Sequence, residues 1–298
     1  MKKSHPVLFR TKAEIFAFIE QNREKHQVKI MCRLYGVTRS GYYAWKARGR
    51  SERSTADDHL WSIIEKIYLE SRGTYGSPRI YEELRACGVR IGRKRVERLM
   101  RNRGIKARCA RIYRSKRGLK KYFTDIPNRS LDVIPVKPDQ VWVGDITYLK
   151  AGGQWRYLAA VMDKFSRRIV GCSLSKYKDS ALTLSAFNQA VENRKPQTGA
   201  IFHTDRGTEY GTFIFRDRLS EVGFVQSMNR PSGKMTDNAF MESFFHTMKA
   251  ECIHGVKFAD DQAISSQIWS YIPFYNSKRM HSSLGYLSPE VYELNAAL

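Results

Sequence analysis

Hydrophobic residues recur along this chain with two different periods. Between residues 11 and 103, apolar side chains return every three or four positions, which is the spacing of helices that bury one face. The pattern predicts helices at residues 11–24, 26–35, 39–48, 57–71, 79–87 and 93–103. Pro127, Pro135 and Pro138 then interrupt regular structure. Beyond them, shorter apolar runs bounded by turn residues predict β-strands.

The second and third predicted helices are joined by a short turn, Gly36-Val37-Thr38. A helix, a short glycine-containing turn and a second helix form the helix-turn-helix pattern. The second of these helices carries three side chains suited to DNA contact, Arg39, Tyr43 and Lys46. A plain helical hairpin is the alternative, and the charge of the chain favours the DNA-binding interpretation.

The same arrangement is repeated between residues 51 and 110. The helix predicted at 57–71 is followed by a glycine-containing loop and by two helices joined through a second glycine-containing turn. The last helix, at 93–103, begins with Arg93, Lys94 and Arg95. In DNA-binding motifs this end of the recognition helix meets bases and phosphates, so these three residues are candidate DNA contacts.

The second half of the chain combines strands with helices. Strands are predicted at residues 140–149, 155–163, 167–174, 200–205 and 223–228, and helices at 179–193, 212–222, 236–253 and 259–275, before a short helix after Pro289. Three strands in a meander, followed by alternating helices and strands, predict a mixed α/β domain. This order matches a ribonuclease-H-like fold. The expected fold class is therefore α/β, a mixed-sheet core preceded by all-α helix-turn-helix segments.

Changes in periodicity, charge and proline content divide the chain into five expected parts. The first two are an N-terminal helix-turn-helix at residues 1–50 and a second helix-turn-helix-like helical domain at 51–110. A basic linker at 111–138 leads to the ribonuclease-H-like core at 139–255, and a helical extension at 256–298 completes the chain.

Positive charge is concentrated in the first half of the chain. The protein has 298 residues and a formal net charge of +23. Residues 1–138 hold 34 lysines and arginines against 13 acids, whereas residues 139–298 hold 18 against 16. This split indicates a polyanionic partner, most simply nucleic acid; a basic surface kept for solubility and an anionic membrane are the alternatives. Residues 101–121 carry ten of the cations and no acid, as expected of a linker that follows a phosphate backbone or of a solvated spacer.

Several other classes of protein are not expected from the sequence. The chain has no apolar run long enough for a transmembrane helix, and no long apolar stretch follows its basic N-terminus, so neither a membrane span nor a secretory signal is predicted. The cysteines are scattered along the chain and odd in number, which indicates reduced thiols in a cytosolic protein. The chain has no CxxC pair for structural zinc and no phosphate-binding loop of an ATP-driven motor.

Three acids in the second half of the chain stand where they could bind metal. Asp145 lies within the first predicted strand, Asp205 closes the fourth, and Glu242 lies on the helix at 236–253. That helix has an expected buried stripe and a polar face, formed respectively by Met241, Phe245, Met248 and Cys252 and by Asn238, Glu242, His246 and Lys249. Carboxylates that meet at one site can hold two divalent cations about 3.5–4 Å apart, which drive phosphoryl transfer on nucleic acid.

Each acid alone also has an ordinary structural explanation. An aspartate at a strand end is usually a turn or capping residue, and a glutamate on a helix is usually solvated. Asp163, at the end of the second predicted strand, is interpreted in that way, and His203 is interpreted as a strand residue rather than a ligand. Together, the three acids support a catalytic interpretation more strongly than each does alone, because of their order, the strands and helix that carry them, and the basic segment before them.

Several segments resemble the DDE transposases of bacterial insertion sequences, which have a retroviral-integrase-like core. The segments that carry the three acids are Asp145-Ile-Thr-Tyr, His203-Thr-Asp-Arg-Gly-Thr-Glu-Tyr and Asp237-Asn-Ala-Phe-Met-Glu-Ser-Phe-Phe-His-Thr-Met-Lys-Ala-Glu. Further matches are Tyr42-Tyr-Ala-Trp-Lys, Tyr75-Gly-Ser-Pro-Arg-Ile and Tyr275-Asn-Ser-Lys-Arg-Met-His-Ser-Ser-Leu-Gly-Tyr-Leu-Ser-Pro. Together they span nearly the whole chain. They resemble the second-frame protein of copy-and-paste elements whose transposase is made by frameshifting between two reading frames.

The resemblance implies that Asp145, Asp205 and Glu242 bind two Mg²⁺ ions, for which Mn²⁺ can substitute. It also implies that they catalyse strand cleavage and strand transfer at the inverted-repeat ends of a mobile element. The expected partners are DNA, as those ends and as target, an upstream-frame protein or fusion, and further copies of the chain on DNA. No membrane is expected, and the location would be the bacterial cytoplasm, at the nucleoid. Lys249 is expected to hold DNA near the cut, and Arg39, Arg93 and Arg95 to help bind the ends.

Two features depart from the resembled pattern. Asp205 and Glu242 are separated by 36 residues, one more than is usual in the family, and the turn at Pro231-Ser-Gly-Lys is expected to absorb the difference. The zinc-binding His/Cys module of retroviral integrases is absent, and the helix-turn-helix segments take its place. A non-catalytic DNA binder, such as a regulator of the element, is the alternative function.

Overall fold

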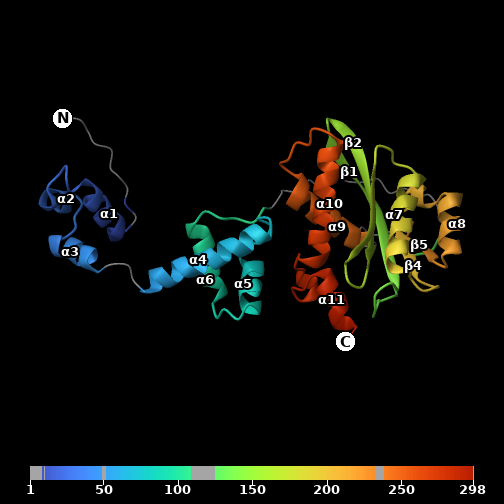
Figure 1. Ribbon diagram of the computed structural model, residues 1–298, viewed down its shortest axis with the longest axis horizontal. Helices are drawn as coiled ribbons and strands as arrows, with labels where there is room; N and C mark the ends of the chain where they lie inside the picture. The colour runs from blue at the N-terminus through green and yellow to red at the C-terminus, as the bar shows by residue number, and fades with distance from the viewer. Residues whose placement is uncertain (1–8, 10, 49–51, 109–124, 232–237, 298) are drawn as a thin grey trace. The chain divides into compact units, whose positions relative to one another are not determined.

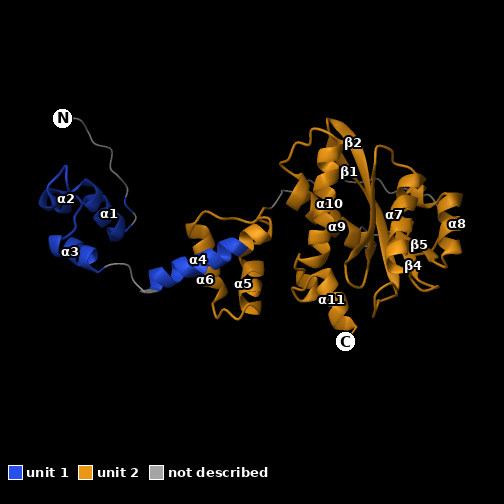
Figure 2. Ribbon diagram, viewed as in Figure 1, with its two compact units in different colours: residues 1–66 blue, residues 67–298 orange. Residues whose placement is uncertain are grey.

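The computed structural model describes residues 9, 11–48, 52–108, 125–231 and 238–297 (Figure 1). The chain divides into two compact units, residues 1–66 and 67–298 (Figure 2). The division falls within helix α4 (Glu52–Glu70). Half of the predicted basic linker, residues 111–124, and most of the turn expected to absorb the extra residue before Glu242 lie outside the described residues.

The first unit begins with three short helices, α1 (Lys12–Asn22), α2 (Val28–Leu34) and α3 (Arg39–Ala47). Thr38 caps α3, because its hydroxyl oxygen accepts a hydrogen bond from the amide of Gly41 at 3.1 Å. The helices enclose a small core formed by Phe16, Ile19, Met31, Cys32 and Tyr42. The helix-turn-helix order expected at α2 and α3 is therefore present.

The second unit opens with a helical segment that follows the end of α4. Helix α5 (Ser77–Ala86) has Pro78 in its first turn, where a residue without an amide proton loses no helical hydrogen bond. Helix α6 (Arg93–Asn102) packs against α5. Their buried residues are Ile80, Leu84, Val96, Leu99 and Met100.

A five-stranded mixed sheet forms the centre of the second unit. Its strands are β1 (Val141–Ala151), β2 (Gln154–Asp163), β3 (Ile169–Ser175), β4 (Ile201–Thr204) and β5 (Val225–Met228), in the order β3-β2-β1-β4-β5. The first three strands form an antiparallel meander, whereas β4 runs parallel to β1 and β5 parallel to β4. This is the expected ribonuclease-H-like arrangement.

Helices cover both faces of the sheet (Figure 1). One face packs against α7 (Ser180–Arg194) and α8 (Phe213–Glu221), and the other against α9 (Ala239–Met248) and α10 (Asp261–Ser277), with α11 (Pro289–Ala296) beside α10. Strand side chains alternate between the faces. On β1, Trp142 and Ile146 join the core beneath α7 and α8, whereas Val143 and Leu149 join the core beneath α9 and α10.

The edge strand β3 is held from both sides. The side chain of Asn276 on α10 pairs with the backbone of Ile169, accepting at 2.9 Å and donating at 2.8 Å, and so occupies part of the open strand edge. On the sheet face, Gly171 lets α7 approach closely, because a Cβ there would lie 2.2 Å from the carbonyl oxygen of Ala186.

Helix α11 is tied to this sheet edge by a network of ion pairs. Glu293 accepts hydrogen bonds from Arg168 at 2.9 Å and from Arg194 at 2.9 and 3.0 Å. Arg194 also donates to Asp139 at 2.9 Å. The C-terminal helical extension is therefore part of the folded second unit.

The expectations of reduced thiols and of no membrane span can be compared with the described residues. Four cysteines lie among them, Cys32, Cys87, Cys172 and Cys252, and all four are free thiols. None of the helices described is long and apolar enough to cross a lipid bilayer.

Candidate active site

Asp145 lies on β1, and Asp205 directly follows β4, the parallel strand beside β1. Strand β1 pairs with β4 in a register that sets Gly144 opposite Thr204, and each aspartate is the next residue along. Asp145 is buried, and the alternation of β1 turns it toward the face covered by α9. Asp205 was expected to close the fourth strand; β4 ends one residue earlier, and Asp205 opens the turn that follows.

The turn after β4 positions the Asp205 carboxylate. Its Oδ1 accepts a hydrogen bond from the amide of Gly207 at 2.9 Å. A Cβ on Gly207 would come within 2.9 Å of that oxygen and 2.8 Å of Oε2 of Glu209, so a larger side chain there would displace one or both carboxylates. The turn therefore fixes Asp205 beside a second carboxylate.

The pKa of a buried tyrosine is affected by both aspartates. Tyr210 is almost fully buried, and burial first, followed by the negative charges of Asp145 and Asp205, raises the pKa of its phenol well above the ordinary value. Both carboxylates therefore act on one phenol.

Glu242 lies in the first turn of α9 and is exposed. The start of this helix is fixed against β1, because the side-chain amide of Asn238 donates to the carbonyl oxygen of Gly144 at 3.2 Å. That carbonyl immediately precedes Asp145. The helix carrying the third acid is thus anchored at the residue before the first acid.

The expected two-sided character of this helix is largely confirmed. The stripe of Met241, Phe245, Met248 and Cys252 is buried, and Glu242 and His246 are exposed. Asn238, expected on the polar face with them, is instead buried, because it is the residue that anchors the helix to β1. The predicted single helix also ends in a π-helical turn, η3 (Lys249–Ile253), which buries Glu251 and Cys252 together.

The three acids do not form a closed ligand set in this structure. Within the described part of the chain, no three His, Cys, Asp or Glu side chains are grouped closely enough to hold a metal ion. The structure brings Asp145 and Asp205 together and leaves Glu242 outside such a group. Carboxylate oxygens are nevertheless the ligands that Mg²⁺ prefers, so the donor chemistry suits this cation.

Two residues interpreted as structural in the sequence are structural here. Oδ1 of Asp163 accepts hydrogen bonds from the amides of Phe165 at 2.7 Å and Ser166 at 3.1 Å, and burial raises the pKa of Asp163 to about 6. His203 is fully buried between Ser227 and Asn229, each at 2.8 Å, and links β4 to the segment at β5.

One ion pair beside Asp205 was not anticipated from the sequence. The ammonium of Lys178 lies 2.7 Å from Oε1 of Glu209, which is largely buried in the same turn. Arg206, also buried, donates to the carbonyl oxygen of Ile126 at 3.0 Å. Both Arg206 and Glu209 belong to the segment that carries the family resemblance, which was the available signal. Lys178 lies outside that segment, so no sequence signal indicated its place beside Glu209.

The predicted DNA contacts on the helical segments differ in exposure. On α3, Arg39, Tyr43 and Lys46 are exposed, but Lys46 also forms an ion pair with Glu20 at 3.0 Å. On α6, Arg93 and Lys94 are exposed and Arg95 is half-buried. On η3, Lys249 is half-buried. A helix that presents cations at its start is suited to bind phosphate groups.

The chain matches known families over most of its length. Integrase core domain families match residues 135–233 and 242–296, and an HTH-like domain family matches residues 55–113. The transposase InsF for insertion sequence IS3A of Escherichia coli (strain K12) is 36% identical over 283 residues, which cover 93% of this chain and 98% of the relative. An uncharacterized 31 kDa protein of insertion element IS600 from Shigella sonnei is 34% identical, covering 88% of this chain and 97% of that protein.

Solved structures similar to the core are retroviral integrase domains. The catalytic core domain of HTLV-2 integrase, in complex with magnesium, has a TM-score of 0.42 and 17% identity, covering 53% of this chain and 97% of that one. The catalytic core domain of BIV integrase has a TM-score of 0.41 and 11% identity, covering 53% and 96%. On its similarity to InsF across nearly the full length of both proteins, the chain belongs to the family of insertion-sequence transposases that have an integrase core domain.

Proposed function

We propose that this chain is a DNA transposase that cleaves and joins strands at the inverted-repeat ends of its element, with Asp145, Asp205 and Glu242 as its catalytic residues. The observation that carries the proposal is the juxtaposition of Asp145 on β1 with Asp205 directly after β4, the strand that pairs parallel to β1 in an integrase core. Because the start of α9 is hydrogen-bonded beside Asp145, the helix that bears Glu242 is the natural source of the third carboxylate.

The three carboxylates would hold two Mg²⁺ ions, or Mn²⁺ in their place. Bound between protein and phosphate, such ions neutralise charge on the phosphodiester and favour a deprotonated oxygen nucleophile. The role of the protein would be to hold the carboxylate oxygens in place before DNA binds. Strand pairing does so for Asp145, and the amide of Gly207 does so for Asp205.

Basic residues would bind the DNA around this site. Lys249, at the end of α9, would hold the strand near the cut, and Arg39, Tyr43, Lys46, Arg93, Lys94 and Arg95 would bind the element ends through the two helical segments. Joining two ends requires more than one copy of the chain on DNA, with the upstream-frame protein or fusion as a further partner. We propose that boundaries at residues 50, 110, 138 and 255 separate the two helical segments, the basic linker, the core and the C-terminal extension. Its DNA substrate would place the protein in the bacterial cytoplasm, at the nucleoid.

The substitution Asp205→Asn tests the catalytic assignment. The variant removes one negative oxygen at nearly constant volume, so it should bind a terminal-repeat duplex like the unmodified chain but give no cleavage with Mg²⁺ or Mn²⁺. Asp217→Asn is the matched control, because Asp217 is exposed on α8, on the other side of the sheet, and should cleave normally. Cleavage and binding are measured on labelled oligonucleotides, with the upstream-frame protein supplied.

Two outcomes would oppose the proposal in different ways. Cleavage by Asp205→Asn at the rate of the control would remove Asp205 from the catalytic set. Retention of DNA by the unmodified chain, without product under either metal, would favour the non-catalytic DNA binder instead.

A further inference from the structure

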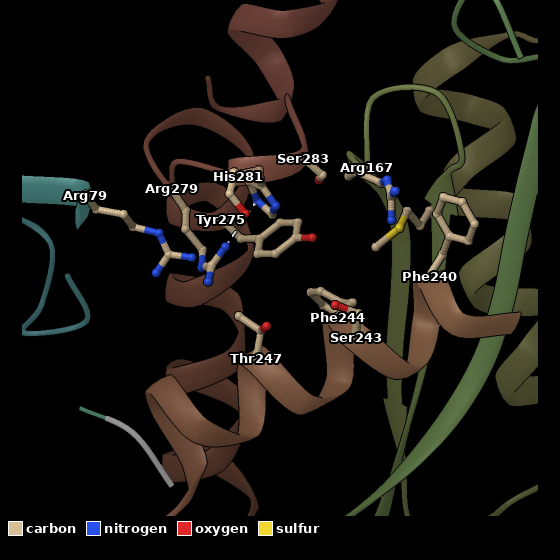
Figure 3. Close-up of a pocket in the computed structure, with 12 residues that line it drawn as sticks. Arg79, Arg167, Phe240, Ser243, Phe244, Thr247, Tyr275, Arg279, His281 and Ser283 are labelled. Carbon is tan, nitrogen blue, oxygen red and sulfur yellow. Dashed lines mark hydrogen bonds between the residues drawn. The ribbon is translucent and has the colours of Figure 1, made fainter. Parts of the chain in front are cut away.

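A polar pocket in the second unit gathers three arginines from distant parts of the sequence (Figure 3). It has a volume of about 130 Å³ and is lined by Arg79 of α5, Arg167 of the turn between β2 and β3, and Arg279 after α10. Ser243 and Thr247 of α9 line the same pocket. None of the three arginines was singled out from the sequence as a site residue, although Arg79 and Arg279 lie in segments that carry the family resemblance.

The charge of Arg279 is already balanced. Its guanidinium lies within 2.8–3.1 Å of both carboxylate oxygens of Glu251, and the side chains of both residues are 6% exposed. His281, beside it, adds no charge near neutral pH. Burial, reinforced by the charges of Arg279, Arg79 and Arg167, lowers the pKa of His281 to about 3.

Arg79 and Arg167 leave the pocket with an uncompensated positive charge. Across the part of the chain that the structure describes, neither guanidinium is within ion-pair distance of a carboxylate. Both are half-buried, and burial lowers the pKa of each. Two partly desolvated cations that face one small cavity create a site that favours an anion.

The backbone at Arg167 is in an unusual conformation. Its φ angle is 66°, in the left-handed region that favours glycine or asparagine. The guanidinium lies over the ring of Phe240 on α9, 3.8 Å from its centroid, which directs it to the pocket.

We infer that this pocket binds the phosphate backbone of DNA, with Arg79 and Arg167 as charged contacts on its two sides and the hydroxyls of Ser243 and Thr247 as further donors. Arg guanidinium groups and hydroxyls are suited to phosphate oxygens. The volume lies below the roughly 300–1,000 Å³ of pockets that enclose whole small molecules, so it suits backbone phosphate groups better than a whole nucleotide.

The pocket lies on the helix that carries Glu242, since Ser243 is the next residue. A phosphate held there would fix the strand relative to the third acid of the proposed active site. The inference thus rests on the proposed function and adds to it a specific point at which the DNA backbone is positioned.

The salt dependence of DNA binding tests the inference without any catalytic step. Binding of the full chain to a terminal-repeat duplex is measured in EDTA by fluorescence anisotropy, between about 50 and 200 mM KCl. Arg79→Gln and Arg167→Gln should each weaken binding at least about tenfold. Each should also lower the slope of log affinity against log salt by about one. Because the two arginines line opposite sides of the pocket, each should neutralise a phosphate of its own, so the double variant should lower the slope by about two.

Three controls make the result specific. Arg216→Gln removes the same charge from an exposed position on α8, across the sheet, and should leave the slope unchanged. Arg167→Lys keeps the charge and should keep the slope. Thermal unfolding should show that each variant is folded, because both arginines are partly exposed and have no carboxylate partner among the described residues.

Other results would overturn the inference. Unchanged slopes in both single variants would do so, as would a double variant whose slope equals that of the unmodified chain. If inorganic phosphate stabilises the unmodified chain and not the variants while DNA binding is unaffected, the pocket takes free phosphate instead. Metal-dependent cleavage by the unmodified chain, measured in parallel, shows separately whether the proposed function holds.

Discussion

The buried ion pair between Glu251 and Arg279 gives the strongest stability prediction. Both side chains are 6% exposed, and Tyr271 also donates to Glu251 at 2.7 Å. In Glu251→Gln the guanidinium of Arg279 would remain buried with its charge uncompensated. Breaking a buried pair from one side costs about 3–5 kcal/mol.

That cost translates into a large change in melting temperature. In domains of comparable size, each kcal/mol shifts Tm by about 2–4 °C, so Glu251→Gln should lower the Tm of the second unit by about 6–20 °C. Glu97→Gln is the matched control. Glu97 pairs with Arg101 at 2.9 Å, but their side chains are 51% and 74% exposed, and such helix pairs contribute about 0.3–0.5 kcal/mol.

Differential scanning calorimetry of the full chain measures both shifts. A double replacement, Glu251→Leu with Arg279→Met, removes both charges and should recover much of the loss, because apolar side chains can replace a buried pair. Equal Tm values for Glu251→Gln and Glu97→Gln would show that burial of the pair does not govern its energetics.

Two further predictions concern packing and pH. Gly171→Ala should destabilise the core by about 3 kcal/mol in urea unfolding, because its Cβ would meet α7 at 2.2 Å. Gly92→Ala, which meets nothing within 4 Å, should cost less than half as much, and similar losses would refute the close approach. His281 has a folded pKa of about 3, below its unfolded value, so the unfolded chain binds a proton that the folded chain excludes, and stability falls with pH below about 6.5. Between pH 6.5 and 5 this contribution should be about 2 kcal/mol, lost in His281→Asn. Asp163, with its pKa raised to about 6, acts in the opposite sense, so only the difference between the two proteins is informative; parallel pH profiles would contradict the assignment.

Local patterns in the sequence were sufficient to predict the elements of both units. A helix that buries one face needs apolar residues every three or four positions, and a strand needs short apolar runs, so α3, α6 and β1–β5 lie within a few residues of their predicted ranges. The structural interpretation of Asp163 was also possible, because a turn followed it directly. Motifs around Asp145, Asp205 and Glu242 identified the family.

Tertiary structure decided which of several similar residues does what. Glu242 and Glu251 lie on one predicted helix, yet Glu242 is exposed and Glu251 is buried, because Glu251 pairs with Arg279 from the segment after α10. Asn238 is buried, although it was expected on the polar face, because its side-chain amide donates a hydrogen bond to the carbonyl oxygen of Gly144 on β1. Arg79, Arg167 and Arg279 are ordinary cations in the sequence and share one pocket in the fold. Periodicity records whether a side chain is buried, whereas its partner is set by long-range packing that no local pattern contains.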